Sequence, residues 1–340
     1  MLSSRRQAVL AALVAEYVNT GQPVGSRALV ERHALGCSPA TVRSELGGLE
    51  EAGYLWQPHV SAGRIPTDAG YRAFVDEFQA AIGAVGLSSA EVARIHEAYV
   101  ALEHELADVM RQTSTLLSRF TNYVAVVAAP ALRRARMRRV SVVPLNERRA
   151  LVVVVTDSGQ VANRTVDFEM PVTLEVFAEV ERYLTAVLED KVGEDVLTFR
   201  ESAAARGDSF ARVTLTVLDE VVDCLKEADA DRVVTGGMGA LLAQPEFADP
   251  GVARPVIALL EDGLGLLRVL SEVLHERDVA VRIGHENHLD ALGAMSLVAT
   301  AYGSDDRAGV VGVIGPTRMD YPRAMATVRT VADTLTDVLT

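Results

Sequence analysis

The chain has 340 residues, of which 49% are hydrophobic and only 5% aromatic, so it is long enough for two or three domains with mainly aliphatic cores. No apolar run approaches the ~18 residues of a membrane-spanning helix, and the N-terminus lacks a secretory signal pattern, so neither class of protein is expected. The net charge of −13 excludes a protein that coats nucleic acid along its whole surface, although residues 1–75, with seven arginines and six acids, are close to neutral.

Two helices are predicted before residue 35. In the first, four apolar side chains recur at the spacing of one helix face, namely Leu10, Leu13, Val14 and Tyr17. The segment 19–21 ends in glycine, which is a helix-ending signal. The second helix is short, and Ser26 is placed to cap its N-terminus.

The third predicted helix runs from Pro39 to about Ala52 and is the candidate recognition helix. Ser38 is placed to cap it, with proline at the first helical position. Its inner face carries Val42, Leu46 and Leu49. The opposite face is small and polar, so the helix can lie deep in the major groove, and recognition helices meet base edges near their N-terminal end. The expected DNA contacts from this segment are Ser38, Thr41, Arg43 and Ser44.

Two adjacent glycines, Gly47 and Gly48, lie inside this predicted helix. Each costs ~1 kcal/mol relative to alanine in a helix interior, so we expect the helix to be marginally stable. Gly47 belongs to the outward face, where a methyl group would hinder approach to DNA. Gly48 lies toward the flank, so Gly48→Ala is expected to be the safer, stabilising change, unless the glycine permits close helix packing.

A β-hairpin is predicted directly after this helix. Residues 54–57 form a short strand, residues 58–63 a loop ending in glycine, and residues 64–65 the returning strand. Thr67 then caps a further helix. Such a hairpin is the wing of a winged helix-turn-helix, and its expected DNA contacts are His59, Ser61, Gly63 and Arg64.

Several runs in residues 17–76 resemble one known family: TGQPVGS, SPATVRSE, LEEAGYL, PHVSAGRIPT and GYRAFVD. Two distant segments agree with it as well, VRIGHEN at 281–287 and GVIGPTRMDY at 312–321. The chain therefore resembles the heat-inducible transcription repressor HrcA, and the resemblance spans both ends of the chain. Ser44 stands where that family usually has asparagine, and the two glycines replace better helix formers, so the base contacts are expected to differ in detail.

Beyond residue 80 the pattern is α+β, with strands before and after a mainly helical middle. We expect a helical linker over residues 81–120 and a helix at residues 256–274. The resemblance implies a fold in three parts: an N-terminal winged helix-turn-helix, a GAF-like α+β domain, and a dimerisation domain inserted into it. The corresponding boundaries are 1–80 for the first, 121–168 with 256–340 for the second, and 169–255 for the third.

Enzymatic and metal-binding alternatives find little support. The two histidines of HENH at 285–288 lack the HExxH zinc spacing, and GGMG at 236–239 lacks the residues of a phosphate loop. Cys37 and Cys224 form no disulfide framework, which fits a reducing cytoplasm. A basic run at residues 133–139 is interpreted as solvated charge. No catalytic residue, cofactor or metal is therefore expected, and the protein is not expected to be an enzyme.

The resemblance implies a cytoplasmic repressor of chaperone operons. It would bind double-stranded DNA as a homodimer at an inverted-repeat operator, called CIRCE in this family, and be released on heat stress. The chaperonin GroEL is the implied partner that keeps the repressor competent. The alternative is a transcriptional regulator that senses a small molecule bound in the GAF-like domain.

Overall fold

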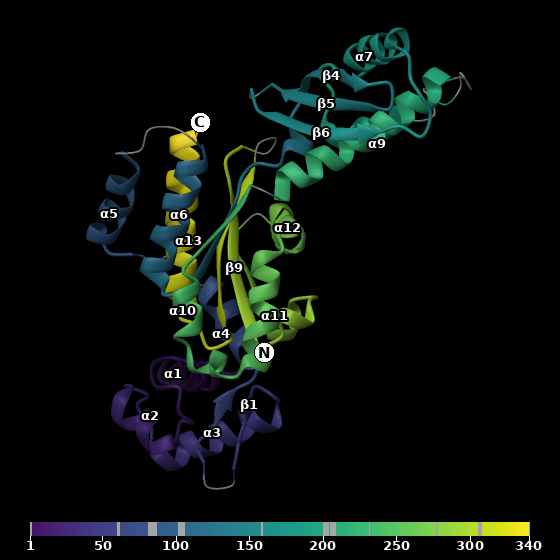
Figure 1. Cartoon of the computed structure of the whole chain (residues 1–340). Coiled ribbons are helices and arrows are strands. Elements are labelled where there is room, and N and C mark those ends of the chain that lie inside the picture. Colours follow the sequence, from purple (N-terminus) through teal and green to yellow (C-terminus); the bar gives the residue numbers. More distant parts are fainter. Residues whose placement is uncertain are drawn as a thin grey trace.

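The computed structural model describes residues 2–59, 62–80, 87–100, 106–157, 159–199, 204, 209–230, 232–276, 278–304 and 308–339. Helices and sheets are mixed, as the α+β prediction requires. Figure 1 shows an N-terminal unit (residues 2–80), a central unit built on a five-stranded sheet, and an inserted unit (residues 132–230) at the end far from the N-terminal unit. Among the described residues, none of the helices combines the length and hydropathy that a membrane crossing requires.

The N-terminal unit consists of α1 (Ser4–Thr20), α2 (Ser26–Arg32), α3 (Pro39–Glu51), β1 (Leu55–Trp56), β2 (Ile65–Pro66) and α4 (Asp68–Ala80). Local sequence sets the helix ends. Ser3 caps α1 by accepting a hydrogen bond from the N–H of Arg6, and Gly21 ends it with φ 64°, a left-handed conformation that glycine adopts without strain. The buried apolar side chains of α1, α2 and α3 meet in one core, which includes Leu10, Leu13, Leu29, Val42, Leu46 and Leu49.

The central unit contains a five-stranded antiparallel sheet in the order β7-β3-β10-β9-β8. Its strands are β3 (Val124–Ala128), β7 (Val233–Gly236), β8 (Ala280–Ile283), β9 (Met295–Tyr302) and β10 (Gly309–Pro316). Its helices are α5 (Ser89–Val100), α6 (Leu106–Thr121), α10 (Met238–Leu242), α11 (Pro250–Glu261), α12 (Gly263–Ser271) and α13 (Tyr321–Leu339). Short 3₁₀ turns lie at Pro245–Ala248, Val273–His275, Gly284–Glu286 and Asp290–Leu292.

Both faces of this sheet are buried, because successive side chains of a strand point to opposite faces. In β3, Ala125 and Val127 belong to the same core as α13 and the N-terminal unit. Val124 and Val126 belong to a second core, formed with α11 and α12. In Figure 1 the helices α6 and α13 accordingly lie on one side of the sheet and α11 and α12 on the other.

The inserted unit has its own three-stranded antiparallel sheet, β4-β5-β6, and its own hydrophobic core. It comprises 3₁₀ turns at Leu132–Arg134 and Gly193–Phe199, strands β4 (Met137–Asn146), β5 (Arg149–Thr156) and β6 (Val161–Asp167), and helices α7 (Leu174–Leu188) and α9 (Ser209–Ala230). The expected insertion began at residue 169, and the strands before it were assigned to the same domain as the C-terminal strands. The structure divides the chain earlier, because β4, β5 and β6 pack on α7 and α9 and not on the central sheet.

The helix predicted at residues 256–274 differs from the structure in one respect. It is two helices, α11 and α12, separated at Asp262, whose backbone is extended (φ −87°, ψ 91°). The break brings Gly263 against the end of α9, where a β-carbon on Gly263 would stand 2.8 Å from the carbonyl oxygen of Ala230. A tertiary contact therefore sets this helix boundary.

Candidate nucleic-acid interface

Helix α3 is held by its apolar face and leaves a polar face exposed. Val42, Leu46 and Leu49 are at most 1% exposed. Ser38 caps the helix: its Oγ accepts a hydrogen bond from the Thr41 N–H (3.2 Å) and lies 3.0 Å from Thr41 Oγ1. The exposed face near this N-terminal end carries Ser38, Arg43 and Ser44, with Thr41 half-buried beside them.

The charges around α3 are distributed unevenly. Arg6 Nε donates to Glu45 Oε2 at 3.1 Å, and Arg64 Nε donates to Glu50 Oε2 at 2.8 Å, so these two acids of α3 are neutralised. Arg43 is exposed and has no ion pair or hydrogen bond to a described side chain. The outer face of α3 therefore presents one unpaired guanidinium among small polar groups.

The glycines of α3 have unequal surroundings. A β-carbon on Gly47 would have no neighbouring atom within 4 Å, whereas one on Gly48 would stand 2.5 Å from a terminal nitrogen of Arg6. The guanidinium of Arg6 lies over Gly48 on its way to Glu45. Gly48 is thus the position with a close neighbour inside the protein, the flexible end of the Arg6 side chain. The expectation that a methyl group on Gly47 would hinder approach to DNA stays a prediction.

The hairpin after α3 is anchored at its base. Leu55 pairs with Pro66, and Trp56 with Ile65. The side-chain amide of Gln57 donates to the carbonyl of Ala62 at 2.7 Å. His59 is exposed at the tip, and the expected contact residue Ser61 lies outside the described residues.

Gly63 and Arg64, both expected to contact DNA, have internal partners in the structure. The backbones of Arg64 and Val24 exchange two hydrogen bonds of 2.9 Å, which tie the hairpin to the α1–α2 turn. A β-carbon on Gly63 would stand 2.5 Å from backbone atoms of Val24. The Arg64 side chain is only 18% exposed and is directed to Glu50. Both residues support the hairpin.

Helix α4 joins the N-terminal unit to the central unit through partly buried polar contacts. Arg72 Nε donates to Glu286 Oε1 at 2.8 Å, a second nitrogen of Arg72 pairs with the other carboxylate oxygen, and that nitrogen also donates to the carbonyl of Val281. Burial raises the pKa of Glu286, but the hydrogen bonds from Arg72 and the Ile283 N–H lower it more, so its pKa lies below the usual value. The hydrogen bond to Glu286 raises the pKa of Arg72.

Two further contacts complete this junction. Asp68 Oδ2 accepts hydrogen bonds from the backbone N–H of His285 (3.2 Å) and lies 2.9 Å from its Nδ1. Arg318 donates to the carbonyl of Val18 (3.1 Å) and pairs with Glu246. The residues 281–287 and 312–321, noted in the sequence only for their resemblance, therefore hold the N-terminal unit in place. Their contact with α4 carried no signal in the sequence, because it joins residues more than 200 positions apart.

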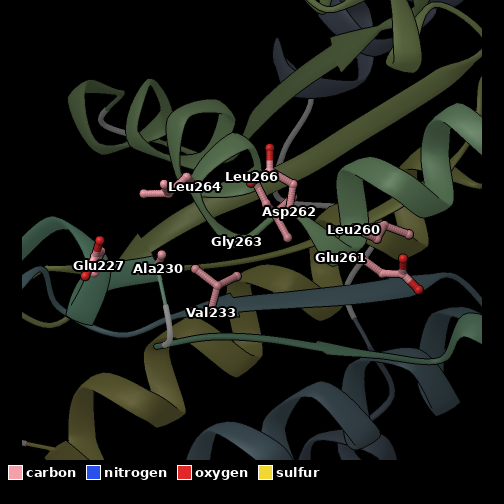
Figure 2. A pocket seen from close by; sticks show the side chains of 9 residues that line it. All are labelled: Glu227, Ala230, Val233, Leu260, Glu261, Asp262, Gly263, Leu264 and Leu266. Carbon is pink, nitrogen blue, oxygen red and sulfur yellow. The ribbon is translucent and has the colours of Figure 1, made fainter.

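Of the histidines in 285–288, His285 is directed to Asp68, and no group of three potential metal ligands occurs among the described residues. Acidic side chains also line a pocket of about 500 Å³ between the end of α9 and the α11–α12 break. Figure 2 shows Glu227 and Glu261 on opposite sides of that pocket, so its carboxylates do not converge on one point.

Comparison with known proteins decides the family. The family model described as the HrcA protein C-terminal domain matches residues 107–325. A heat-inducible transcription repressor HrcA from Frankia casuarinae is 41% identical, over 100% of this chain and 99% of the relative. The chain belongs to the HrcA family. A more distant HrcA, from Acetivibrio thermocellus, is 34% identical over 96% of this chain and 93% of its own length.

The HrcA relatives cover the N-terminal unit as well as the part matched by the C-terminal family model. They are named transcription repressors, which is a regulatory and not a catalytic role. A crystal structure described only as that of a hypothetical protein has the same fold, with a TM-score of 0.62 and 23% identity over 99% of this chain and 98% of that one.

Proposed function

We propose that the N-terminal unit is a winged helix-turn-helix that binds double-stranded DNA, with α3 in the major groove and the β1–β2 hairpin as the wing. The observation that carries this proposal is the outer face of α3. There Arg43 is exposed and unpaired, while Glu45 and Glu50 beside it are neutralised by other arginines. A guanidinium near the N-terminal end of a recognition helix can bind the O6 and N7 atoms of a guanine.

The other proposed DNA contacts are side chains that lie near Arg43 on α3 or on the exposed part of the hairpin. Ser38, Thr41 and Ser44 place hydroxyl groups beside Arg43, where they can donate to phosphate or base oxygens. His59 of the hairpin, with Ser61 two residues later in sequence, supplies the DNA contact of the wing. Gly63 and Arg64 act indirectly, because they fix the hairpin against Val24 and Glu50.

We further propose that the chain represses heat-shock operons as a cytoplasmic homodimer. Its HrcA relatives are named heat-inducible repressors. An inverted-repeat operator such as CIRCE requires two-fold symmetry of the protein. In this proposal the central unit is the GAF-like domain, the inserted unit dimerises, and the chaperonin GroEL maintains the active repressor.

The inserted unit offers a surface for this dimer. Its exposed large apolar side chains include Val143 and Leu145 on β4, and Met170 and Leu174 before and at the start of α7. Backbone hydrogen bonds from Phe168 and Val172 to the turn after Leu145 bring these segments together. We call Val143, Leu145, Met170 and Leu174 the apolar patch. It lies in the unit farthest from α3, so two copies joined there keep their DNA-binding surfaces free.

A gel-shift titration tests DNA recognition. Arg43→Ala is expected to cost about 1–3 kcal/mol of affinity for an inverted-repeat operator and much less for random DNA. Arg254→Ala is the matched control, because Arg254 is an exposed arginine on α11 of the central unit. If Arg43→Ala leaves the ratio of operator to random affinity unchanged, Arg43 is not a base contact and the proposed orientation of α3 is wrong.

A further inference from the structure

A cleft of about 560 Å³ separates the N-terminal unit from the central unit. Its volume is within the range of small-molecule sites, about 300–1,000 Å³. From the N-terminal unit it is lined mainly by α1, the β1–β2 hairpin and the start of α4. From the central unit it is lined by Glu246, His285, Thr317 and Arg318.

The lining of the cleft includes both apolar and charged residues. Trp56 is 48% exposed, although it is large and apolar, and it lines the cleft together with Ile65 and Pro66. The charged residues include the carboxylates of Asp68 and Glu246. Each already has one basic neighbour, His285 or Arg318, and both of these face the same cleft. Apart from His285, the lining therefore carries two carboxylates and one guanidinium.

Tyr71 lies at the floor of the cleft and is 2% exposed. Its hydroxyl is buried and has no hydrogen-bond partner among the described residues. A buried polar group without a hydrogen-bond partner destabilises the fold. Burial raises the pKa of this hydroxyl, with a further contribution from neighbouring groups that include Glu246. Tyr71 therefore remains neutral and is able to accept or donate one hydrogen bond.

We propose that this cleft binds a small planar organic cation. Its ring would stack on Trp56, since an indole face attracts cations most strongly among aromatic side chains. Its N–H groups would be accepted by the Asp68 and Glu246 carboxylates and by the Tyr71 hydroxyl. An amidinium on an aromatic ring combines these properties. The lining disfavours an anion, because two carboxylates face the cleft.

Binding in this cleft would also affect the proposed DNA contacts. Trp56 precedes the tip of the hairpin, and Tyr71 belongs to the helix that carries the Arg72–Glu286 contact. A ligand that touches both units stabilises their relative orientation, and any change in DNA affinity must be matched by an equal change in ligand affinity. The binding itself does not depend on the proposed DNA-binding function, whereas this coupling rests on it.

The chain contains a single tryptophan, Trp56, so its fluorescence reports on this cleft alone. We expect benzamidine, added to the full chain, to change Trp56 emission saturably and to raise the melting temperature. Benzamide, its neutral isostere, is expected to bind at least tenfold more weakly, and benzoate not at all. Absence of a saturable change with benzamidine, or equal affinity for benzamidine and benzamide, would overturn the proposal.

Tyr71→Phe tests the floor of the site. It retains the ring, which packs 5.8 Å from that of Tyr321, and removes only the hydroxyl. We expect the dissociation constant of benzamidine to rise about 3- to 10-fold, the range for one hydrogen bond. Tyr183→Phe in the inserted unit is the control and should leave it unchanged. An unchanged dissociation constant in Tyr71→Phe would remove the cleft as the site. None of these titrations contains DNA, so their failure is separate from a failure of operator binding.

Discussion

Gly47 and Gly48 are adjacent in α3, but their surroundings differ, so we expect substitution by alanine to change stability differently at the two positions. Because nothing lies within 4 Å of a β-carbon on Gly47, Gly47→Ala gains only helix propensity. We expect the free energy of unfolding to rise by about 1 kcal/mol. Gly48→Ala should gain less, since its methyl group displaces Arg6 from Glu45. Urea unfolding of the full chain, followed by Trp56 fluorescence, measures both.

The double variant Arg6→Ala/Gly48→Ala separates the two effects. In the Arg6→Ala background the space beside residue 48 is empty, so Gly48→Ala should recover a gain close to that of Gly47→Ala. If Gly48→Ala in the parent chain raises the free energy of unfolding as much as Gly47→Ala does, the contact between residue 48 and Arg6 does not affect stability.

Arg64 provides a second test at the scale of one side chain. The arginine is mostly buried and paired with Glu50, so Arg64→Ala should lower the stability of the N-terminal unit. The dependence of DNA affinity on salt should keep its slope, because no phosphate contact is lost. Glu50→Gln should reduce stability similarly. A salt slope reduced by about 1 in Arg64→Ala would instead identify Arg64 as a phosphate contact.

Among the elements, α4 has the contact of greatest consequence, the pair of Arg72 and Glu286. In a double-mutant cycle with Arg72→Ala and Glu286→Gln we expect a coupling free energy of about 0.5–3 kcal/mol. Arg323→Ala with Glu91→Gln tests a pair joined at 3.0 Å whose arginine is 45% exposed, against 28% for Arg72, and it should couple less. Additive effects of Arg72→Ala and Glu286→Gln would show that the two units are joined by other contacts.

The same contact predicts a pH dependence. The pKa of Glu286 in the folded chain lies below its usual value of 4.5. Its contribution to stability is therefore complete above that value and is lost as the pH falls through the lower, folded pKa. Urea midpoints measured between pH 6 and pH 3 should decline, and Glu286→Gln should remove part of the decline. An identical decline in Glu286→Gln would assign it to other carboxylates.

Local patterns predicted most of the elements. The cap at Ser38, the apolar spacing of α3 and the hairpin at residues 54–65 all depend on neighbours within a few positions, and the structure contains each of them. Local patterns could not predict which of the two larger sheets each strand joins. Strand β4 pairs with β5 in one unit and β3 pairs with β10 in another, yet all four are rich in valine. Which sheet a strand joins depends on long-range packing.

The candidate site shows the same division. The exposure of Arg43 and Ser44 follows from helix periodicity, which is a local property. The internal roles of Gly63 and Arg64 depend on Val24 and Glu50, and the junction at α4 depends on residues beyond 280. Such contacts become visible only once the chain is folded.

For the whole molecule, the proposed dimer makes a direct prediction. Leu145→Asp together with Met170→Asp places two charges in the apolar patch, whose side chains are 55% and 62% exposed. We expect light scattering to give twice 36.4 kDa for the parent chain and 36.4 kDa for this variant. Leu264→Asp, at a 52% exposed position on α12, is the control and should remain dimeric. A double variant that stays dimeric would place the interface elsewhere.

The order of strands in the central sheet has a consequence for synthesis on the ribosome. Strand β10 is the last strand in sequence, yet it lies in the middle of the sheet between β3 and β9. Residues 124–128 can pair with β7 earlier, but their pairing with β10 must wait for residues 309–316. At roughly 5–20 residues per second, the N-terminal unit leaves the ribosome well before the surface on which α4 docks exists. A nascent chain thus exposes the proposed DNA-binding unit without its support, and only a chain synthesised past β10 can hold that unit in place.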